Sequence, residues 1–397
     1  MNRTTSETTR PRLVTTPFLL VMLSNFAYFL AVGATLPTVP LFVEGPLGGG
    51  SVAVGLTIGV FSLAAVLLRP FTGKVADKRG RRVLIIVGAA IVAASLLGYA
   101  VTNTLWVLMV LRVFSGAGEA LFYVGTASAI NDLAPDERRG EALSYFSLSL
   151  FAGIGLGPIL GESILKAAGF DAAWLVAAAA CGLAAVVGGF IPETRPQDLN
   201  HDSPSRLLAG SALLPGTVMA ASIWGLAMFT TFVPLYALHI GLSGSRFLFA
   251  LHSAVVFIIR LFGARLPDRL GAPRAATGAL GCSVIGFVIM GMFDSSAGLL
   301  VGTVVWSLGH SLAFPALMSM AVKGAPASER GAVIGTFTAF FDLAFGVGAM
   351  AAGGIVDVSG YAGGFYSASI AAGAGLLLLQ FRKRRKARSL ATSTATL

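Results

Sequence analysis

Long apolar runs separated by short polar gaps dominate the chain. A membrane-spanning helix needs about 20 mostly apolar residues. The runs predict twelve such helices, at 17–43, 52–72, 83–102, 104–130, 141–167, 171–191, 211–239, 246–264, 275–293, 297–321, 332–356 and 362–381. The separators near Asn103 and Asp294 are short, and the division into two helices at each rests on length. Unbroken runs favour helices over a β-barrel, whose strands alternate in segments of about ten residues. We therefore expect an all-α integral membrane protein.

Composition supports this class. Hydrophobic residues make up 55% of the 397 residues and charged residues only 12%, and the mean hydropathy is +0.82. A soluble protein this apolar would lack the polar surface to cover itself. This excludes a cytosolic enzyme, a disordered protein and a secreted disulfide scaffold. Cys181 and Cys282 both lie in apolar runs, so we expect buried thiols and no metal site.

The distribution of basic residues predicts the orientation. Of 28 Lys and Arg residues, Arg69, Arg112 and Arg260 lie within helices, and only Lys166 and Arg246 lie in outer loops if the N-terminus is inside. The other 23 then lie in inner segments, so we expect both termini in the cytoplasm and a multi-pass protein of a bacterial plasma (inner) membrane. The net charge of +10 therefore reflects topology and not nucleic-acid binding. The basic cluster 382–388 is expected to contact anionic lipid head groups.

An internal repeat divides the chain. At an offset of 191 residues, Arg69 matches Arg260, Asp77 matches Asp268, and Gly80 matches Gly271, without gaps. This predicts two pseudo-symmetric six-helix bundles, 1–191 and 211–397, joined by a cytoplasmic linker at 192–210. Parallel repeats of this kind place a binding site between the halves near the membrane midplane.

Three motifs carry a resemblance to a known family. The segment GKVADKRGRR, 73–82, resembles the signature of the major facilitator superfamily, and RVFSGAGEA, 112–120, resembles the Arg-containing motif of its fourth helix. The segment GIGLGPILGE, 153–162, is similar to the Gly-Pro motif of drug:proton antiporters, except that Glu162 stands where a second Gly is usual. The resemblance implies alternating access between two bundles. The last motif implies export.

Gating residues are expected at two places. In the family the position of Asp77 lies beside the inner start of the eleventh helix, where a helix N-terminus favours an anion; the alternative is a topological anchor. Gly153 and Gly157 share a helix face that permits close packing, and Pro158 permits a bend; the alternative is a packing seam. The gating candidates are Gly73, Asp77, Arg81, Gly153, Gly157, Pro158 and Asp268.

Ionisable groups within spanning helices cost at least about 2.5–3.5 kcal/mol on insertion scales and are functional candidates. Arg112 and Glu119 are seven residues apart on one helix face, a rise of about 10 Å. We expect this pair to carry proton coupling, which the resemblance also implies for the Arg position; the alternative is a structural ion pair. Glu162 lies at a similar depth to Arg112 and is a second candidate partner for it.

The remaining proton-coupling candidates lie in the second half. His310 matches Glu119 at the 191-residue offset and is either a titrating group or a hydrogen-bonded packing residue. Asp342 lies near the middle of its helix and is a proton or substrate candidate. Arg69 and Arg260 lie near inner helix ends, where we expect them to snorkel and serve a structural role.

The substrate is expected to contact aromatic and polar residues on the first, seventh and tenth helices. Such linings suit an amphipathic or aromatic organic molecule; the alternative is packing or lipid contact. The candidates are Asn25, Tyr28, Trp224, Phe229, Tyr236, Trp306 and Phe314.

These observations predict a secondary active transporter, a proton-coupled exporter (antiporter) of a small amphipathic organic molecule or drug. The alternative is a proton symporter or uniporter that imports a sugar or other metabolite; a channel and a membrane-embedded enzyme are further alternatives. The sequence contains no phosphate-binding Gly-x-x-x-x-Gly-Lys-Ser/Thr loop and no His-Glu-x-x-His or Cys-x-x-Cys motif. We therefore expect no enzymatic activity and no cofactor, a proton gradient as the driving force, and a monomer.

Overall fold

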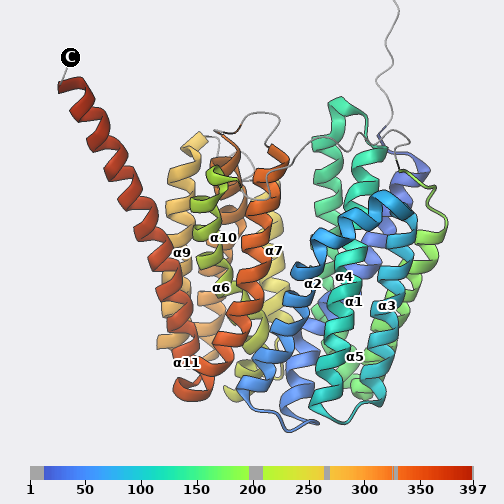
Figure 1. The fold of residues 1–397 in the computed structure, drawn as a ribbon. Coiled ribbons are helices and arrows are strands. Elements are labelled where there is room, and N and C mark those ends of the chain that lie inside the picture. The colour runs from blue at the N-terminus through green and yellow to red at the C-terminus, as the bar shows by residue number, and fades with distance from the viewer. Residues whose placement is uncertain (1–12, 196–208, 263–268, 324, 326–329, 396–397) are drawn as a thin grey trace, which may run out of the picture.

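The computed structural model describes residues 13–195, 209–262, 269–323, 325 and 330–395. This part of the chain folds into helices and contains no strand (Figure 1). The elements are α1 (Thr16–Glu44), α2 (Ser51–Arg79), α3 (Arg81–Val101), α4 (Leu105–Leu133), the short 3-10 helix η1 (Asp136–Arg138), α5 (Arg139–Gly189), α6 (Gly210–His239), α7 (Arg246–Phe262), α9 (Ala272–Met292), α10 (Ser296–Val322) and α11 (Arg330–Ala395).

Two elements turn back on themselves at a glycine. Gly169 in α5 has φ 83° and Gly360 in α11 has φ 68°, both outside helical geometry. Glycine adopts this left-handed conformation at no steric cost, so each glycine joins two helical arms. In Figure 1 the second arm of α11 runs in the opposite direction to the first, back to the end of the molecule where the label C stands.

The structure reproduces the internal repeat. The bounds of α3 and α9 differ by 191 at both ends, as do the first residues of α4 and α10 and those of α5 and α11. The turning glycines Gly169 and Gly360 differ by the same number. One helical unit therefore occurs twice, although the residue bounds expected for the two domains and their linker stay a prediction.

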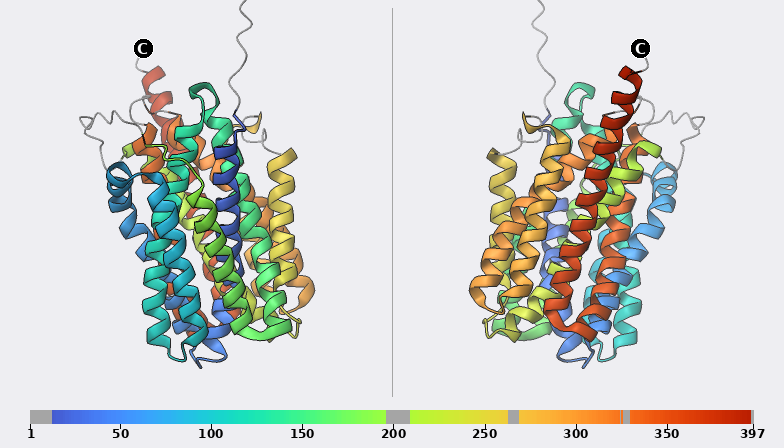
Figure 2. Two further views of the ribbon diagram at one scale, coloured as in Figure 1. Left: turned by 90° about the vertical axis from the view of Figure 1, so that its right-hand side faces the viewer. Right: turned by 90° about the vertical axis from the view of Figure 1, so that its left-hand side faces the viewer.

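The helices form two groups. In the N-terminal half α1 packs against α5, and α3 and α4 pack against each other; in the C-terminal half α6 packs against α11, and α9 against α10. Figure 2 shows each half from its own side. Contacts between the halves are made by α2 with α11, α5 with α7 and α1 with α6. The first residues of α1 and the last of α11 lie at the same end of the molecule.

Nine helices among the described residues are long and apolar enough to cross a membrane. Two of them, Arg139–Gly189 and Ala332–Arg382, have 51 residues each and contain the turning glycines. The protein therefore has the helical architecture of a multi-pass membrane protein. The count of twelve spans stays a prediction at this point.

Candidate functional site

Three charged side chains meet where the two halves touch. Arg69 of α2 forms an ion pair with Asp342 of α11, and its Nη2 lies 3.5 Å from Oε1 of Glu119 of α4. The guanidinium also lies over the ring of Tyr123, 4.8 Å from the ring centroid. We call Arg69, Glu119 and Asp342 the central triad. It joins α2 and α4 of the N-terminal half to α11 of the C-terminal half.

The charges of the central triad do not cancel. One guanidinium cannot neutralise two carboxylates, so the triad carries one excess negative charge when both acids are ionised. The Glu119 side chain is 11% exposed and that of Asp342 is 19% exposed. Oε2 of Glu119 is buried, and no residue in the described part of the chain forms a hydrogen bond with it. A proton on either acid would balance the charge.

The central triad lies on a seam between α2 and α11. A Cβ added to Gly353 would lie 3.2 Å from Cα of Gly55, and one added to Gly346 would lie 3.2 Å from Cβ of Ser62. Because the two helices run antiparallel, Arg69 and Asp342 are the next pair along this seam toward the end where the chain termini lie. Figure 1 shows α2 and α11 diverging toward that end of the molecule.

The structure corrects the expected partner of Glu119. Nε of Arg112 donates to the Thr57 carbonyl oxygen at 3.1 Å, and the guanidinium lies over the Phe61 ring at 4.6 Å. Arg69 on the neighbouring helix therefore supplies the cation, and the expected Arg112–Glu119 pair is wrong. The expectation that Arg69 snorkels away from the interior is also wrong, because it turns toward two acids instead.

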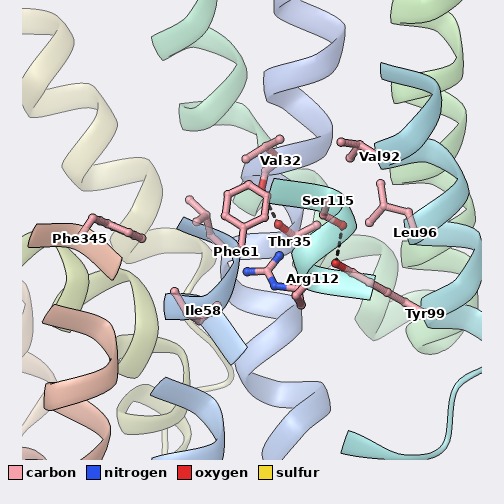
Figure 3. Close-up of a pocket in the computed structure, with 11 residues that line it drawn as sticks. Val32, Thr35, Ile58, Phe61, Val92, Leu96, Tyr99, Arg112, Ser115 and Phe345 are labelled. Atoms are coloured by element: carbon pink, nitrogen blue, oxygen red, sulfur yellow. Dashed lines mark hydrogen bonds between the residues drawn. The ribbon is translucent and has the colours of Figure 1, made fainter. Parts of the chain in front are cut away.

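Arg112 lies beside a cavity inside the N-terminal half (Figure 3). The cavity has a volume of about 50 Å³ and is lined by α1 to α4, with Phe345 of α11 as the lining residue from the other half. Tyr99 and Ser115 share a hydrogen bond of 2.8 Å in its wall. Arg112 itself is only 5% exposed. Its role in proton coupling stays a prediction.

Glu162 joins the halves at a second place. Its carboxylate accepts hydrogen bonds from the backbone N–H of Ser245 at 2.9 and 3.0 Å and from the Ser245 hydroxyl at 2.9 Å. Lys166 lies 3.2 Å away on the same helix. Ser245 directly precedes α7, so the carboxylate lies at the positive end of that helix. The candidate pairing of Glu162 with Arg112 is wrong, because α7 holds this carboxylate.

His310 of α10 lies in an aromatic cluster of the C-terminal half. Its ring centroid is 5.3 Å from that of Trp306 and 5.5 Å from that of His252. His252 in turn stacks on Trp306 at 4.6 Å. The structure therefore brings together Glu119 and Asp342 but places Glu162 and His310 elsewhere.

Most of the expected substrate contacts are packed inside one half. Asn25 donates to the Ser149 hydroxyl at 2.7 Å, Tyr28 stacks on Phe122 at 3.8 Å, and the Tyr236 hydroxyl donates to Asp294 at 2.9 Å. The fully buried candidates are Asn25, Tyr28, Phe229 and Trp306, and Tyr236 is 3% exposed. These five side chains stabilise the halves in this conformation. Trp224 and Phe314 are partly buried. A substrate role stays a prediction for all seven.

The glycine face of α5 packs closely on α1. A Cβ added to Gly153 would lie 2.8 Å from the backbone nitrogen of Leu30, and one added to Gly157 would lie 2.6 Å from that of Ala34. Pro158 is buried in the same helix. The expected close approach of another helix is confirmed, and it occurs within the N-terminal half. A gating role for this face stays a prediction.

The loop motif ties together the start of α3, the end of α4 and the segment that follows α5. Nε of Arg81 donates to Asp132 of α4 at 3.0 Å, and its backbone N–H donates to Glu193 at 2.8 Å. A Cβ added to Gly73 would meet nothing within 4 Å. Asp77 lies in α2, but its side chain is not among those described, and Asp268 lies outside the described residues.

Sequence reasoning missed two participants. A structural role was expected for Arg69 because it lies near a helix end. Its match with Arg260 at the 191-residue offset, however, marks it as part of the repeated unit. Ser245 carries no signal in the sequence, because its contribution is mainly a backbone N–H.

The comparisons with known proteins agree with this architecture. The family model of the Major Facilitator Superfamily matches residues 21–349 and 247–396. The chain belongs to this superfamily. An uncharacterized MFS-type transporter of Salmonella typhimurium is 28% identical over 85% of this chain and 88% of its own length. The uncharacterized MFS-type transporter YhhS of Escherichia coli is 26% identical over 86% of each chain.

Solved structures of two transporters share the fold. The human organic anion transporter MFSD10 superposes with a TM-score of 0.69 and 21% identity, covering 91% of this chain and 98% of that one. The nucleoside transporter NupG superposes with a TM-score of 0.73 and 15% identity over 91% of this chain and 98% of that one. Fold and relatives are thus those of membrane transporters.

Proposed function

We propose that this superfamily transporter is a proton-coupled secondary carrier in which Glu119 and Asp342 share a transported proton through Arg69. The observation that carries the proposal is the central triad, which places two carboxylates on one cation across the boundary between the halves. Intramembrane acids are rare and mark proton pathways in transporters. A proton bound here is therefore sensitive to the relative position of the halves.

The coupling follows from the seam between α2 and α11. When the halves move apart along this seam, Asp342 leaves Arg69. A carboxylate without its cation in the membrane costs at least about 2.5–3.5 kcal/mol, so Asp342 takes up a proton at that step. When the seam closes, Arg69 again stabilises the ionised form and the proton is released. Proton binding and the change of access are thereby linked.

We propose twelve spans. A single helix of 51 residues would be about 77 Å long, far more than the roughly 30 Å hydrocarbon core of a bilayer. The two 51-residue helices therefore count as two crossings each at Gly169 and Gly360. With the other seven candidate spans and α7, whose 17 residues are close to the required length, the chain crosses twelve times.

The orientation follows from the charges. The excess of basic residues in the segments on one side supports cytoplasmic termini in the inner membrane of a bacterium. The basic residues 382–388 follow the last span in α11, although side chains from residue 383 on are not among those described. Contact of this cluster with anionic lipids, and a monomeric state, remain part of the proposal.

The direction of transport is proposed from the 153–162 segment. Its resemblance to the antiporter motif supports export of a small amphipathic organic molecule or drug, in exchange for protons. Import by proton symport is the second candidate, because the central triad serves either direction equally well.

Purified protein reconstituted in proteoliposomes tests the proposal. An imposed proton gradient should drive accumulation of some members of a panel of fluorescent amphipathic compounds, and collapse of the gradient with a protonophore should abolish it. Equal, saturable movement of those compounds with and without the gradient would contradict proton coupling. The direction of accumulation relative to the gradient separates antiport from symport.

A further inference from the structure

A second arginine arrangement lies in the other half of the molecule. The guanidinium carbon of Arg260 of α7 lies 3.8 Å from the ring centroid of Phe151 of α5. Arg260 is also near enough to His310 of α10 to interact with it electrostatically. This contact set again spans the boundary between the halves, because α5 belongs to one and α7 and α10 to the other.

This arrangement is the repeat-related counterpart of the central triad. At the 191-residue offset Arg260 corresponds to Arg69, and His310 corresponds to Glu119. The same offset relates Phe151 to the third member, Asp342. The contact of Arg260 with Phe151 thus repeats that of Arg69 with Asp342, and each arginine reaches across to the opposite half.

The two copies differ in charge. His310 and Phe151 occupy the positions of the two acids, so in the part of the chain that the structure describes Arg260 has no carboxylate partner. Nε of Arg260 and Nδ1 of His310 are buried and find no hydrogen-bond partner among the described residues. An unpaired buried charge is strongly unfavourable, and the ring of Phe151 offsets only part of that cost.

We propose that Arg260 and His310 bind the carboxylate of an organic anion, which supplies the negative charge that Asp342 and Glu119 supply in the other copy. The planar guanidinium presents two parallel donors that match a carboxylate in a bidentate arrangement. Phe151, 39% exposed, offers an apolar surface beside it for the rest of the molecule. This inference rests on the proposed transport function and assigns its substrate class.

Arg112 is the other arginine within a spanning segment for which the described residues supply no carboxylate partner, and its surroundings suit an organic anion less well. Its cavity of about 50 Å³ is much smaller than the roughly 300–1,000 Å³ of sites for organic ligands. Its lining residues also come from one half, except for Phe345 of α11. Arg260, by contrast, meets both halves, as a transported substrate must.

Restoring the missing acid tests the charge deficit. Phe151→Asp places a carboxylate where the repeat has Asp342, and we expect it to melt at a higher temperature than Phe151→Asn, although both lose the ring. In an Arg260→Met background the difference should vanish or reverse. A lower melting temperature for Phe151→Asp than for Phe151→Asn would show that Arg260 is already neutralised and would overturn the proposal.

Ligand binding tests the substrate class without any mutation that adds charge. Melting of the detergent-purified wild-type protein would be followed with sodium formate, acetate, benzoate and naphthoate at constant ionic strength, with chloride and the neutral amides as controls. We expect the carboxylates to raise the melting temperature saturably, as any ligand that binds the native state does. The rise should be largest for the aromatic carboxylates. Apparent affinity should fall by at least about tenfold in Arg260→Met, as expected for loss of a charged hydrogen bond, and persist in Arg112→Met.

Three results would overturn the site. They are no response to any carboxylate, an equal response to chloride alone, and a response that survives Arg260→Met. Because this binding measurement uses no proton gradient, it can fail while coupled transport holds, and coupled transport can fail while it succeeds.

Discussion

The Glu162 carboxylate of α5 accepts the backbone N–H of Ser245, at 2.9 and 3.0 Å, where α7 begins. This contact joins the halves near the end of the molecule opposite the chain termini. Glu162 is 1% exposed, so water contributes little to the stability of its charge. The N-terminus of α7 and Lys166 stabilise the carboxylate instead. We infer that it stabilises closure of the halves at that end.

Neutralising Glu162 should therefore favour opening at this end. Hydrogen bonds to charged groups contribute about 1.5–3 kcal/mol each, so Glu162→Gln should raise the open population by about tenfold or more. Val356 of α11 is 5% exposed and serves as the reporter position. The measurement is the rate at which an impermeant thiol reagent labels the Val356→Cys variant of a protein that lacks Cys181 and Cys282. Lys166→Gln, which leaves the Ser245 bonds in place, should change the rate much less. Equal labelling rates in wild type and Glu162→Gln would show that Glu162 does not stabilise closure of the halves at this end.

A double-mutant cycle should distinguish the two candidate ion pairs. Arg69 and Asp342 are in contact, so Arg69→Met and Asp342→Asn should show a coupling of about 0.5–3 kcal/mol in thermal stability. Arg112→Met and Glu119→Gln should be additive within about 0.5 kcal/mol, because these residues lie about 10 Å apart along one helix. Strong coupling in the second cycle would restore the pairing expected from the sequence.

The close packing of α1 on α5 predicts a position-specific loss of stability. At Gly157 a Cβ would lie 2.6 Å from the Ala34 backbone nitrogen, whereas at Gly182 it would meet nothing within 4 Å. Gly157→Ala should lower the free energy of unfolding by about 1–3 kcal/mol, the usual cost of overpacking. Gly182→Ala in the second arm of α5 should have little effect. Melting curves of the purified variants check this, and similar curves for both would contradict the packing.

Reporter fusions check the orientation. A fusion within 196–208 and one after the C-terminus should both report a cytoplasmic location, and an insertion at Gly169 should report the outside. An outside signal from either of the first two would overturn the topology drawn from the basic residues.

The sequence predicted the all-helical fold and the internal repeat, because both can be recognised from the order of residues along the chain. Apolar length defines the spans, and one offset relates Gly169 to Gly360. It also singled out Glu119 and Asp342, because carboxylates are rare in membrane helices. It failed on the partner of Glu119, since periodicity relates residues on one helix only. Arg69 reaches Glu119 from another helix, and that contact depends on packing.

Aromatic residues do not by themselves identify a substrate site. Phe229 and Trp306 face the interior of one half, where their ring centroids are 4.4 Å apart. In a membrane helix, rings that pack and rings that line a cavity occupy equally apolar environments, so the sequence does not separate them. The charged groups were more informative, because a charge in a membrane helix is costly and therefore marks a functional candidate.

Gradient-driven transport by variants of the central triad tests the proton-coupling claim most directly. Proteoliposomes containing wild type, Glu119→Gln, Asp342→Asn or the double variant would be assayed with a compound that the wild type accumulates, both under a proton gradient and in exchange without one. We expect the single variants to lose most gradient-driven accumulation and the double variant to lose it fully, while all three retain exchange. Wild-type accumulation in the double variant would show that the proton is carried elsewhere.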